Sequence, residues 1–290
     1  MTAAQTLLAR AAPLAFIFLW SMAFVAVRAG LPDVSPLFFL AVRFALATAI
    51  LVAIAALWRL GWTGLAQTWR HFVVAGVLIN ALYLSAAYLA MTGITGATLA
   101  LIGALHPLLT ALLAGPVLGE RFRPRQWLGI ACGIAGVALV VGIDINDLAQ
   151  RAGVAWGLGA VACLTAGTLY YSRYCRGLGL VQANSVQLGA AAAVTAAFAV
   201  AFEDVRAEWT PTALVTLGFL TCGVSLGGMA LLLYMLKTGT AGRVSANFYL
   251  TPGTTAVLGW LILGEALSPL AIVGFAVASM GVWLVQRADA

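Results

Sequence analysis

Two stretches of this sequence share one pattern, HPLLTALLAGPVLGE at 106–120 and TPGTTAVLGWLILGE at 251–265. In each stretch a proline is followed 13 residues later by the glutamate that ends a Leu-Gly-Glu triplet, and the second stretch lies 145 positions after the first. The same offset relates Pro124 to Pro269 and Gly136 to Gly281. The spacing predicts that the chain is one unit of about half its length, written twice.

The composition places the chain in a membrane. Of its 290 residues 63 % are hydrophobic and only 8 % are charged, whereas a soluble domain carries about a quarter charged residues. Apolar runs of roughly 17 to 25 residues, the length that crosses a bilayer, predict an all-α integral membrane protein with ten transmembrane helices. We expect these spans near 13–31, 37–57, 72–91, 97–118, 127–143, 153–172, 184–202, 212–236, 244–263 and 268–286.

The ten spans divide equally between the two copies. Residues 1–143 form a first five-helix repeat, 144–152 a short linker and 153–290 a second five-helix repeat. Because five is odd, the two copies must lie in opposite orientations in the membrane. Two inverted repeats around a central cavity are a recurring design of secondary transporters, with the substrate site near the membrane midplane.

The charges predict the orientation. With the N-terminus inside, 11 of the 15 basic residues fall on inner loops and tails, as the positive-inside rule requires. We therefore expect both termini to be cytoplasmic. The net charge of +6 follows from this topology and does not indicate nucleic-acid binding. The four cysteines and two histidines form no metal-binding pattern, and we expect no metal and no cofactor.

Small residues and prolines predict how the helices pack and bend. Pro107 and Pro252 lie near the middles of spans four and nine, where proline removes a backbone donor and kinks a helix. We expect hinges beside the substrate path, the alternative being an ordinary packing kink. The pattern Gly129-xxx-Gly133-xx-Gly136 returns in span ten, and it lets helices approach closely. The close approach lies either within a monomer or between the subunits of a homodimer.

Arg43 is the most informative charge inside a span. It lies about seven residues into span two, where an ionised side chain costs roughly 2.5–3.5 kcal/mol. One interpretation is that its guanidinium binds a substrate carboxylate through two hydrogen bonds. The other is an internal clamp that bonds helix-end carbonyls or an acid such as Asp33.

Further polar and aromatic residues fall within the spans. His106 directly precedes the proline of span four and is a candidate for substrate or proton binding. Span three carries a polar and aromatic stripe, and others lie before Pro252 and in span eight. The remaining substrate-binding candidates of this kind are Asn80, Tyr83, Tyr88, Ser225, Tyr234, Asn247 and Tyr249.

Together these motifs resemble the drug/metabolite transporter superfamily, and within it the EamA-type proteins of ten helices. The resemblance rests on the run from His106-Pro107 to Leu118-Gly119-Glu120, on Trp20-Ser21-xx-Phe24-xxx-Arg28 and on Pro36 followed by Arg43. It implies export of small metabolites, commonly amino acids, across the bacterial inner membrane, and it adds Trp20 to the substrate-binding candidates. A well-known subset that exports aromatic amino acids often has an aromatic residue where this chain has His106.

The interiors of the predicted spans contain no Asp, Glu or Lys. This pattern disfavours proton-coupled transport of cationic drugs and favours zwitterionic or anionic substrates. We expect an inner-membrane exporter of small amphiphilic metabolites, foremost amino acids including aromatic ones, that works by alternating access around a cavity between spans three, four, eight and nine. The alternative is efflux of drug-like compounds or transport of another metabolite. Since no acid–base pair or metal cluster lies at membrane depth, we do not expect an enzyme.

Overall fold

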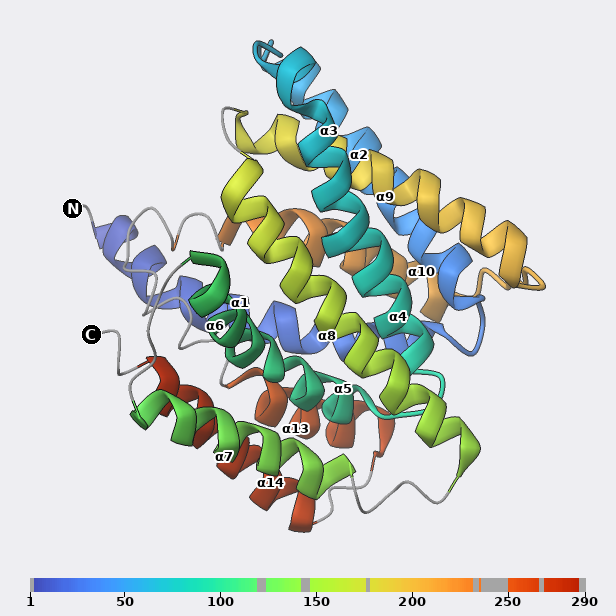
Figure 1. The fold of residues 1–290 in the computed structure, drawn as a ribbon. Helices are drawn as coiled ribbons and strands as arrows, with labels where there is room; N and C mark the ends of the chain where they lie inside the picture. The colour runs from blue at the N-terminus through green and yellow to red at the C-terminus, as the bar shows by residue number, and fades with distance from the viewer. Residues whose placement is uncertain are drawn as a thin grey trace.

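A computed structural model describes residues 3–118, 124–141, 147–175, 178–231, 235, 250–265 and 269–286. The first half consists of α1 (Ala3–Gly30), α2 (Pro36–Leu57), α3 (Leu65–Gly76), the π-helix η1 (Val77–Leu82), α4 (Tyr83–Ala90), α5 (Gly96–Gly103), α6 (Leu105–Leu118) and α7 (Pro124–Val141). The second half consists of α8 (Leu148–Tyr174), α9 (Leu180–Phe202), α10 (Pro211–Gly218), the π-helix η2 (Phe219–Gly228), α13 (Thr251–Leu263) and α14 (Pro269–Gln286). Figure 1 shows these helices in one bundle.

The helices are long and apolar enough for a multi-pass membrane protein. Among the described residues, six helical segments of 20 to 27 residues are able to cross a membrane by length and composition, and four shorter apolar helices accompany them. The segment Leu65–Ala90 counts as one because α3, η1 and α4 continue without a break, as α10 and η2 do in the other half.

The bounds of the helices follow the offset of 145 found in the sequence. Adding 145 to the bounds of α7, 124–141, gives 269–286, which are the bounds of α14. The same addition moves α2 from 36–57 to 181–202, beside α9 at 180–202. It also moves η1 from 77–82 to 222–227, inside η2 at 219–228. Thus the π-helices, like the α-helices, lie at corresponding positions of the two halves.

The glycine pattern lies where two helices touch. α7 packs along α14, and the two lie side by side at one edge of Figure 1. A Cβ on Gly136 would lie 2.6 Å from the backbone nitrogen of Ala278, and one on Gly281 would lie 2.4 Å from that of Gly133. Only glycine allows this approach, so the small residues of the two helices pack against each other within one chain.

The loops after α1 and α9 join the two halves at one end of the bundle. The backbone of Val34 bridges Ala207, and the Ser35 N–H donates to the Arg206 carbonyl at 2.9 Å. The Glu203 carboxylate accepts from the N–H groups of Leu37 at 2.8 Å and Phe38 at 3.0 Å. A residue of the second half therefore caps the first turn of α2, where the free N–H groups attract an anion.

Span four is interrupted close to its proline. α5 ends at Gly103 and α6 begins at Leu105. In a continuous helix the N–H of residue 107 would bond the carbonyl of Gly103, but proline has no N–H, and the regular helix ends at Gly103. Pro252 lies in the first turn of α13, where the missing N–H costs nothing. The preceding part of predicted span nine, where a kink at Pro252 was expected to begin, lies outside the described residues.

The first helix of the second half begins earlier than predicted. α8 begins at Leu148, five residues before the start expected at 153. The Asp147 carboxylate accepts from the Ala149 N–H at 3.3 Å and so caps this helix. Residues 148–152 of the expected linker are therefore helical, and its residues 144–146 lie outside the described residues.

Candidate functional site

A cavity of about 180 Å³ lies among helices from both halves. Since one water needs roughly 10–15 Å³ of such space, there is room for on the order of ten waters or a small metabolite. The walls come from α1, α2, η1 with α4, α8, α9 and η2. The lining residues are Trp20, Ala23, Phe24, Val27, Arg43, Phe44, Ile79, Asn80, Tyr83, Leu84, Ala87, Tyr88, Met91, Leu164, Asn184, Leu188, Val224, Ser225 and Met229.

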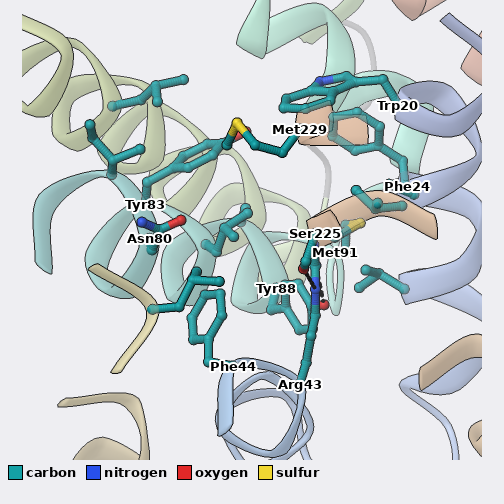
Figure 2. A pocket seen from close by; sticks show the side chains of 18 of the residues that line it. Trp20, Phe24, Arg43, Phe44, Asn80, Tyr83, Tyr88, Met91, Ser225 and Met229 are labelled. Carbon is teal, nitrogen blue, oxygen red and sulfur yellow. Dashed lines mark hydrogen bonds between the residues drawn. The ribbon is translucent and has the colours of Figure 1, made fainter. Parts of the chain in front are cut away.

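Arg43 is the charged residue of this lining. It lies seven residues into α2, is only 6 % exposed, and extends from α2 into the cavity (Figure 2). Its Nε donates to Ser225 Oγ at 3.1 Å and its Nη1 donates to the Tyr88 hydroxyl at 3.0 Å. These bonds tie α2 to α4 and to η2.

No carboxylate among the described residues forms an ion pair with Arg43. Asp33, one predicted partner, instead accepts a hydrogen bond from the Thr210 hydroxyl. The interpretation of Arg43 as a clamp on Asp33 is therefore wrong for the described chain. A guanidinium buried without an anion is costly, since its desolvation is not offset by an ion pair.

Both π-helices contribute to the cavity. η1 carries Asn80 and η2 carries Val224 and Ser225. A π-helix is rare, and it occurs frequently at functional sites because it re-aims side chains and loosens the regular helix hydrogen bonds. In this chain the two π-helices lie at corresponding positions of the halves and on the same cavity.

Aromatic side chains form much of the remaining wall. Figure 2 shows Trp20 and Phe24 on one side of the cavity and Tyr83 on the other, with Met229 between them in this view. Phe44 lies near Arg43 on the side of α2. The site thus combines one cation with broad apolar and aromatic surfaces, which suits an amphiphilic molecule that carries a negative group.

The structure brings together six of the predicted site residues. Trp20, Arg43, Asn80, Tyr83, Tyr88 and Ser225 all line the cavity although they come from four separate helical segments. Tyr234, Asn247 and Tyr249 lie outside the described residues.

His106 does not line the cavity. Its Nδ1 lies 3.1 Å from Thr165 Oγ1 and 3.3 Å from Thr110 Oγ1. Leu164 lines the cavity, and adjacent residues of a helix point in different directions, so His106 meets another side of α8. The position of its imidazole is explained by these two hydroxyl partners.

The cavity also lies elsewhere than predicted. Spans three and eight contribute to it as expected, but the described helices of spans four and nine, α5, α6 and α13, do not. The reason is packing, because α6 lies against α8 and α13 against α1, which separate them from the cavity. Sequence reasoning missed Asn184, whose position near the start of α9 gave no periodic signal.

A second polar cluster lies at the end of α1. Arg28 Nε lies 3.6 Å from Glu265 Oε1, and Arg28 Nη1 donates to the carbonyl of Met91, whose side chain lines the cavity. Burial raises the pKa of the Glu265 carboxyl, and the nearby Arg28 guanidinium opposes this rise. Gly264, with φ 68°, ends α13 in the left-handed conformation and turns Glu265 back toward the helix.

The described residues contain no group of three His, Cys, Asp or Glu side chains suited to a metal ion.

Comparisons with known proteins agree with this architecture. The chain is 23 % identical over 271 residues to the uncharacterized transporter YvbV of Bacillus subtilis (strain 168), covering 93 % of this chain and 88 % of the relative. It is 24 % identical over 281 residues to the uncharacterized inner membrane transporter YedA of Escherichia coli (strain K12), covering 93 % and 88 %. A solved crystal structure with 20 % sequence identity has the same fold, with a TM-score of 0.68 over 97 % of both chains.

The family comparison covers nearly the whole chain. The model of the EamA-like transporter family matches residues 9–142 and matches again over residues 151–287. The family and the relatives are transporters, so the chain is a membrane transporter and not an enzyme. It belongs to the EamA-like transporter family.

Proposed function

We propose that this protein exports small amphiphilic carboxylates across the bacterial inner membrane, foremost amino acids, including aromatic ones. The substrate lies in the cavity on Arg43, and its apolar part lies against the aromatic wall. The single observation that carries this proposal is the buried guanidinium of Arg43, which faces the cavity with no carboxylate partner in the described chain.

A substrate carboxylate supplies the missing anion. Arg43 is held by Tyr88 and Ser225, so its guanidinium is oriented before the substrate arrives. Pre-orientation lowers the entropy lost on binding. Trp20, Phe24 and Tyr83 offer surfaces on which a ring or a branched side chain packs.

Alternating access between two inverted five-helix repeats is the mechanism that we propose. It is supported by the repeated helix bounds at an offset of 145 and by a cavity whose walls come from both halves. Pro107 and Pro252 are the proposed hinges, because the regular helix is interrupted beside Pro107 and Pro252 lies in the first turn of α13 at the corresponding position of the second half. We place both termini in the cytoplasm on the distribution of the basic residues.

Efflux of drug-like compounds is the second candidate function. The apolar and aromatic lining would admit many such molecules. The charge of the cavity separates the two candidates, because Arg43 repels the cationic compounds that are common among drugs.

The test is counterflow in proteoliposomes that contain the purified full chain. The vesicles are loaded with unlabelled amino acids and related carboxylates, and the uptake of labelled phenylalanine or threonine and of labelled carboxylates without an amino group is measured. We expect saturable uptake above empty liposomes that Arg43→Gln abolishes and that Arg70→Gln, at an exposed position of α3, leaves intact. If folded protein exchanges cationic drugs but no carboxylate, the proposal is wrong.

A further inference from the structure

We infer that the cavity selects its substrates by charge and takes monoanions, namely apolar organic carboxylates without a free ammonium group, in preference to zwitterionic amino acids. N-acylated amino acids and 2-oxo acids are the chemical classes that fit. This inference rests on the proposed function, because it concerns the same cavity and the same arginine, and it changes one part of it: among the amphiphilic carboxylates, the monoanions rank ahead of the free amino acids.

The first argument is the absence of any anion for an ammonium group. The lining contains the cation of Arg43 and no Asp or Glu. The sequence around the helices that form the walls agrees, because no Asp or Glu occurs within 1–32, 34–119, 148–202 or 209–264. The acids nearest in sequence have other partners: Asp33 bonds Thr210, Glu203 caps α2 and Glu265 lies beside Arg28.

The second argument is the direction of the hydrogen bonds around Arg43. The hydroxyl oxygens of Tyr88 and Ser225 both accept from the guanidinium. Within the described chain, neither hydroxyl donates to a protein acceptor, so each O–H is available to a ligand. The guanidinium and the two hydroxyls therefore form a cluster of donors, which is complementary to carboxylate oxygens and not to an ammonium group.

The third argument is the chemistry of the remaining polar residues. Asn80 and Asn184 are neutral, and each amide offers both a donor and an acceptor. Such groups match the C=O and N–H of an acylated nitrogen or the oxygen of a 2-oxo acid. An ammonium group brought into the same cavity loses its hydration and meets repulsion from Arg43, with only neutral oxygens in return.

The experiment compares five molecules that share a benzyl group and differ in charge. These are phenylalanine as the zwitterion, N-acetylphenylalanine and phenylpyruvate as monoanions, phenylalanine amide as the cation and N-acetylphenylalanine amide as the neutral molecule. Each competes, at neutral pH, with the counterflow of labelled N-acetylphenylalanine into proteoliposomes of the full chain. Empty liposomes correct for passive permeation.

We expect both monoanions to compete at concentrations at least about tenfold lower than phenylalanine, and we expect the cation not to compete; tenfold corresponds to 1.4 kcal/mol of binding free energy. In Tyr88→Phe, which removes one donor hydroxyl, the half-saturating concentration of the monoanions rises about tenfold while that of the neutral amide is unchanged. This variant retains the ring, so it tests the donor cluster even if an Arg43 variant does not fold. Arg70→Gln, which changes an exposed residue outside the cavity lining, is the control and leaves the order of the five molecules unaltered.

Two outcomes overturn the inference while the proposed function survives. One is phenylalanine competing as well as N-acetylphenylalanine, and the other is the neutral amide competing as well as the monoanions. If N-acetylphenylalanine does not exchange, labelled phenylalanine replaces it, and exchange of phenylalanine alone likewise overturns the inference. If neither the zwitterion nor the monoanions exchange through folded protein, the proposed function itself fails, and the inference fails with it.

Discussion

A single side chain, Arg43, supplies the charge of the cavity lining. Its charge is buried at a free-energy cost, and the described chain provides only two neutral hydroxyls in compensation. His106 shows the opposite case at the same scale. It has the residue type and the depth expected of a transport residue, but its Nδ1 already has the hydroxyls of Thr165 and Thr110 as hydrogen-bond partners. At the scale of residues, the hydrogen-bond partners of a polar side chain therefore say more about its role than its residue type does.

This contrast predicts the effect of His106→Ala. Removal of the imidazole leaves buried Thr165 without that partner, so we expect the free energy of unfolding to fall by about 1–3 kcal/mol. The half-saturating substrate concentration should not change, because His106 does not line the cavity. Thermal unfolding in detergent and counterflow measure the two quantities. A rise in half-saturation with unchanged stability would instead place His106 in the substrate site.

At the scale of elements, the helices are joined by contacts that cross between the halves. Glu203, after α9, caps α2, which carries Arg43. Gly136 and Gly281 let α7 and α14 lie in contact. The first contact holds a helix that lines the cavity, and the second joins two helices that lie outside the lining.

The cap predicts a loss of stability for Glu203→Ala. Two N–H groups in the first turn of α2 lose their acceptor, so we expect the free energy of unfolding to fall by about 1 kcal/mol. Thermal unfolding of the purified protein measures the change. Glu208→Ala is the matched control, since the Glu208 side chain is exposed and it is its backbone N–H that bonds Asp33. Equal melting temperatures for the two variants would contradict the capping role.

The contact between α7 and α14 predicts the effect of Gly136→Ala. The added methyl group would lie 2.6 Å from the Ala278 nitrogen and 2.7 Å from the Gly274 carbonyl oxygen, so the helices must separate. We expect the free energy of unfolding to fall by about 1–3 kcal/mol. The same substitution at Gly159 in α8, where nothing lies within 4 Å, should cost no stability. Indistinguishable unfolding curves for the two variants would show that this close approach is absent in the protein.

At the scale of the whole molecule, the cavity is assembled from two similar halves. Arg28 connects three elements at one end of it, through Glu265 after α13 and the carbonyl of Met91 after α4. The Glu265 carboxyl is partly buried, and burial opposes its ionisation more strongly than Arg28 favours it. Burial thus disfavours the ionised form of Glu265 even beside Arg28.

A pH dependence follows for Glu265→Gln. A carboxyl whose pKa is raised by folding contributes stability that is complete below its pKa in the unfolded chain and is lost as the pH rises through the raised value. We therefore expect the wild-type protein to lose stability relative to Glu265→Gln as the pH rises from the acid range to neutral. Melting temperatures across that range measure the difference, with Glu208→Gln as the exposed control. A variant that melts below the wild-type at neutral pH would mean that the ion pair with Arg28 outweighs burial.

The sequence alone predicted the apolar helices and every polar residue of the cavity lining except Asn184. Transmembrane helices form their backbone hydrogen bonds internally, so hydrophobic length indicates from local information that the chain is all-helical and roughly where its helices lie. The polar and aromatic stripe of span three and the intramembrane arginine were likewise visible, because lipid makes such residues costly unless they have a partner or a cavity. Asn80, Tyr83, Tyr88 and Arg43 do line one cavity.

The tertiary structure decided which of these residues meet. The sequence could not exclude Asp33 as the partner of Arg43 or place His106 behind α8, since hydrogen bonds between distant helices depend on packing angles that no local pattern encodes. The cap of α2 by Glu203, 166 positions after Leu37, is of the same kind. The chain's own chemistry thus determined a bundle of apolar helices with a cation, Arg43, inside one of them. Packing of the two halves decided that this cation faces a cavity, because only the assembled helices determine which side of each helix remains uncovered.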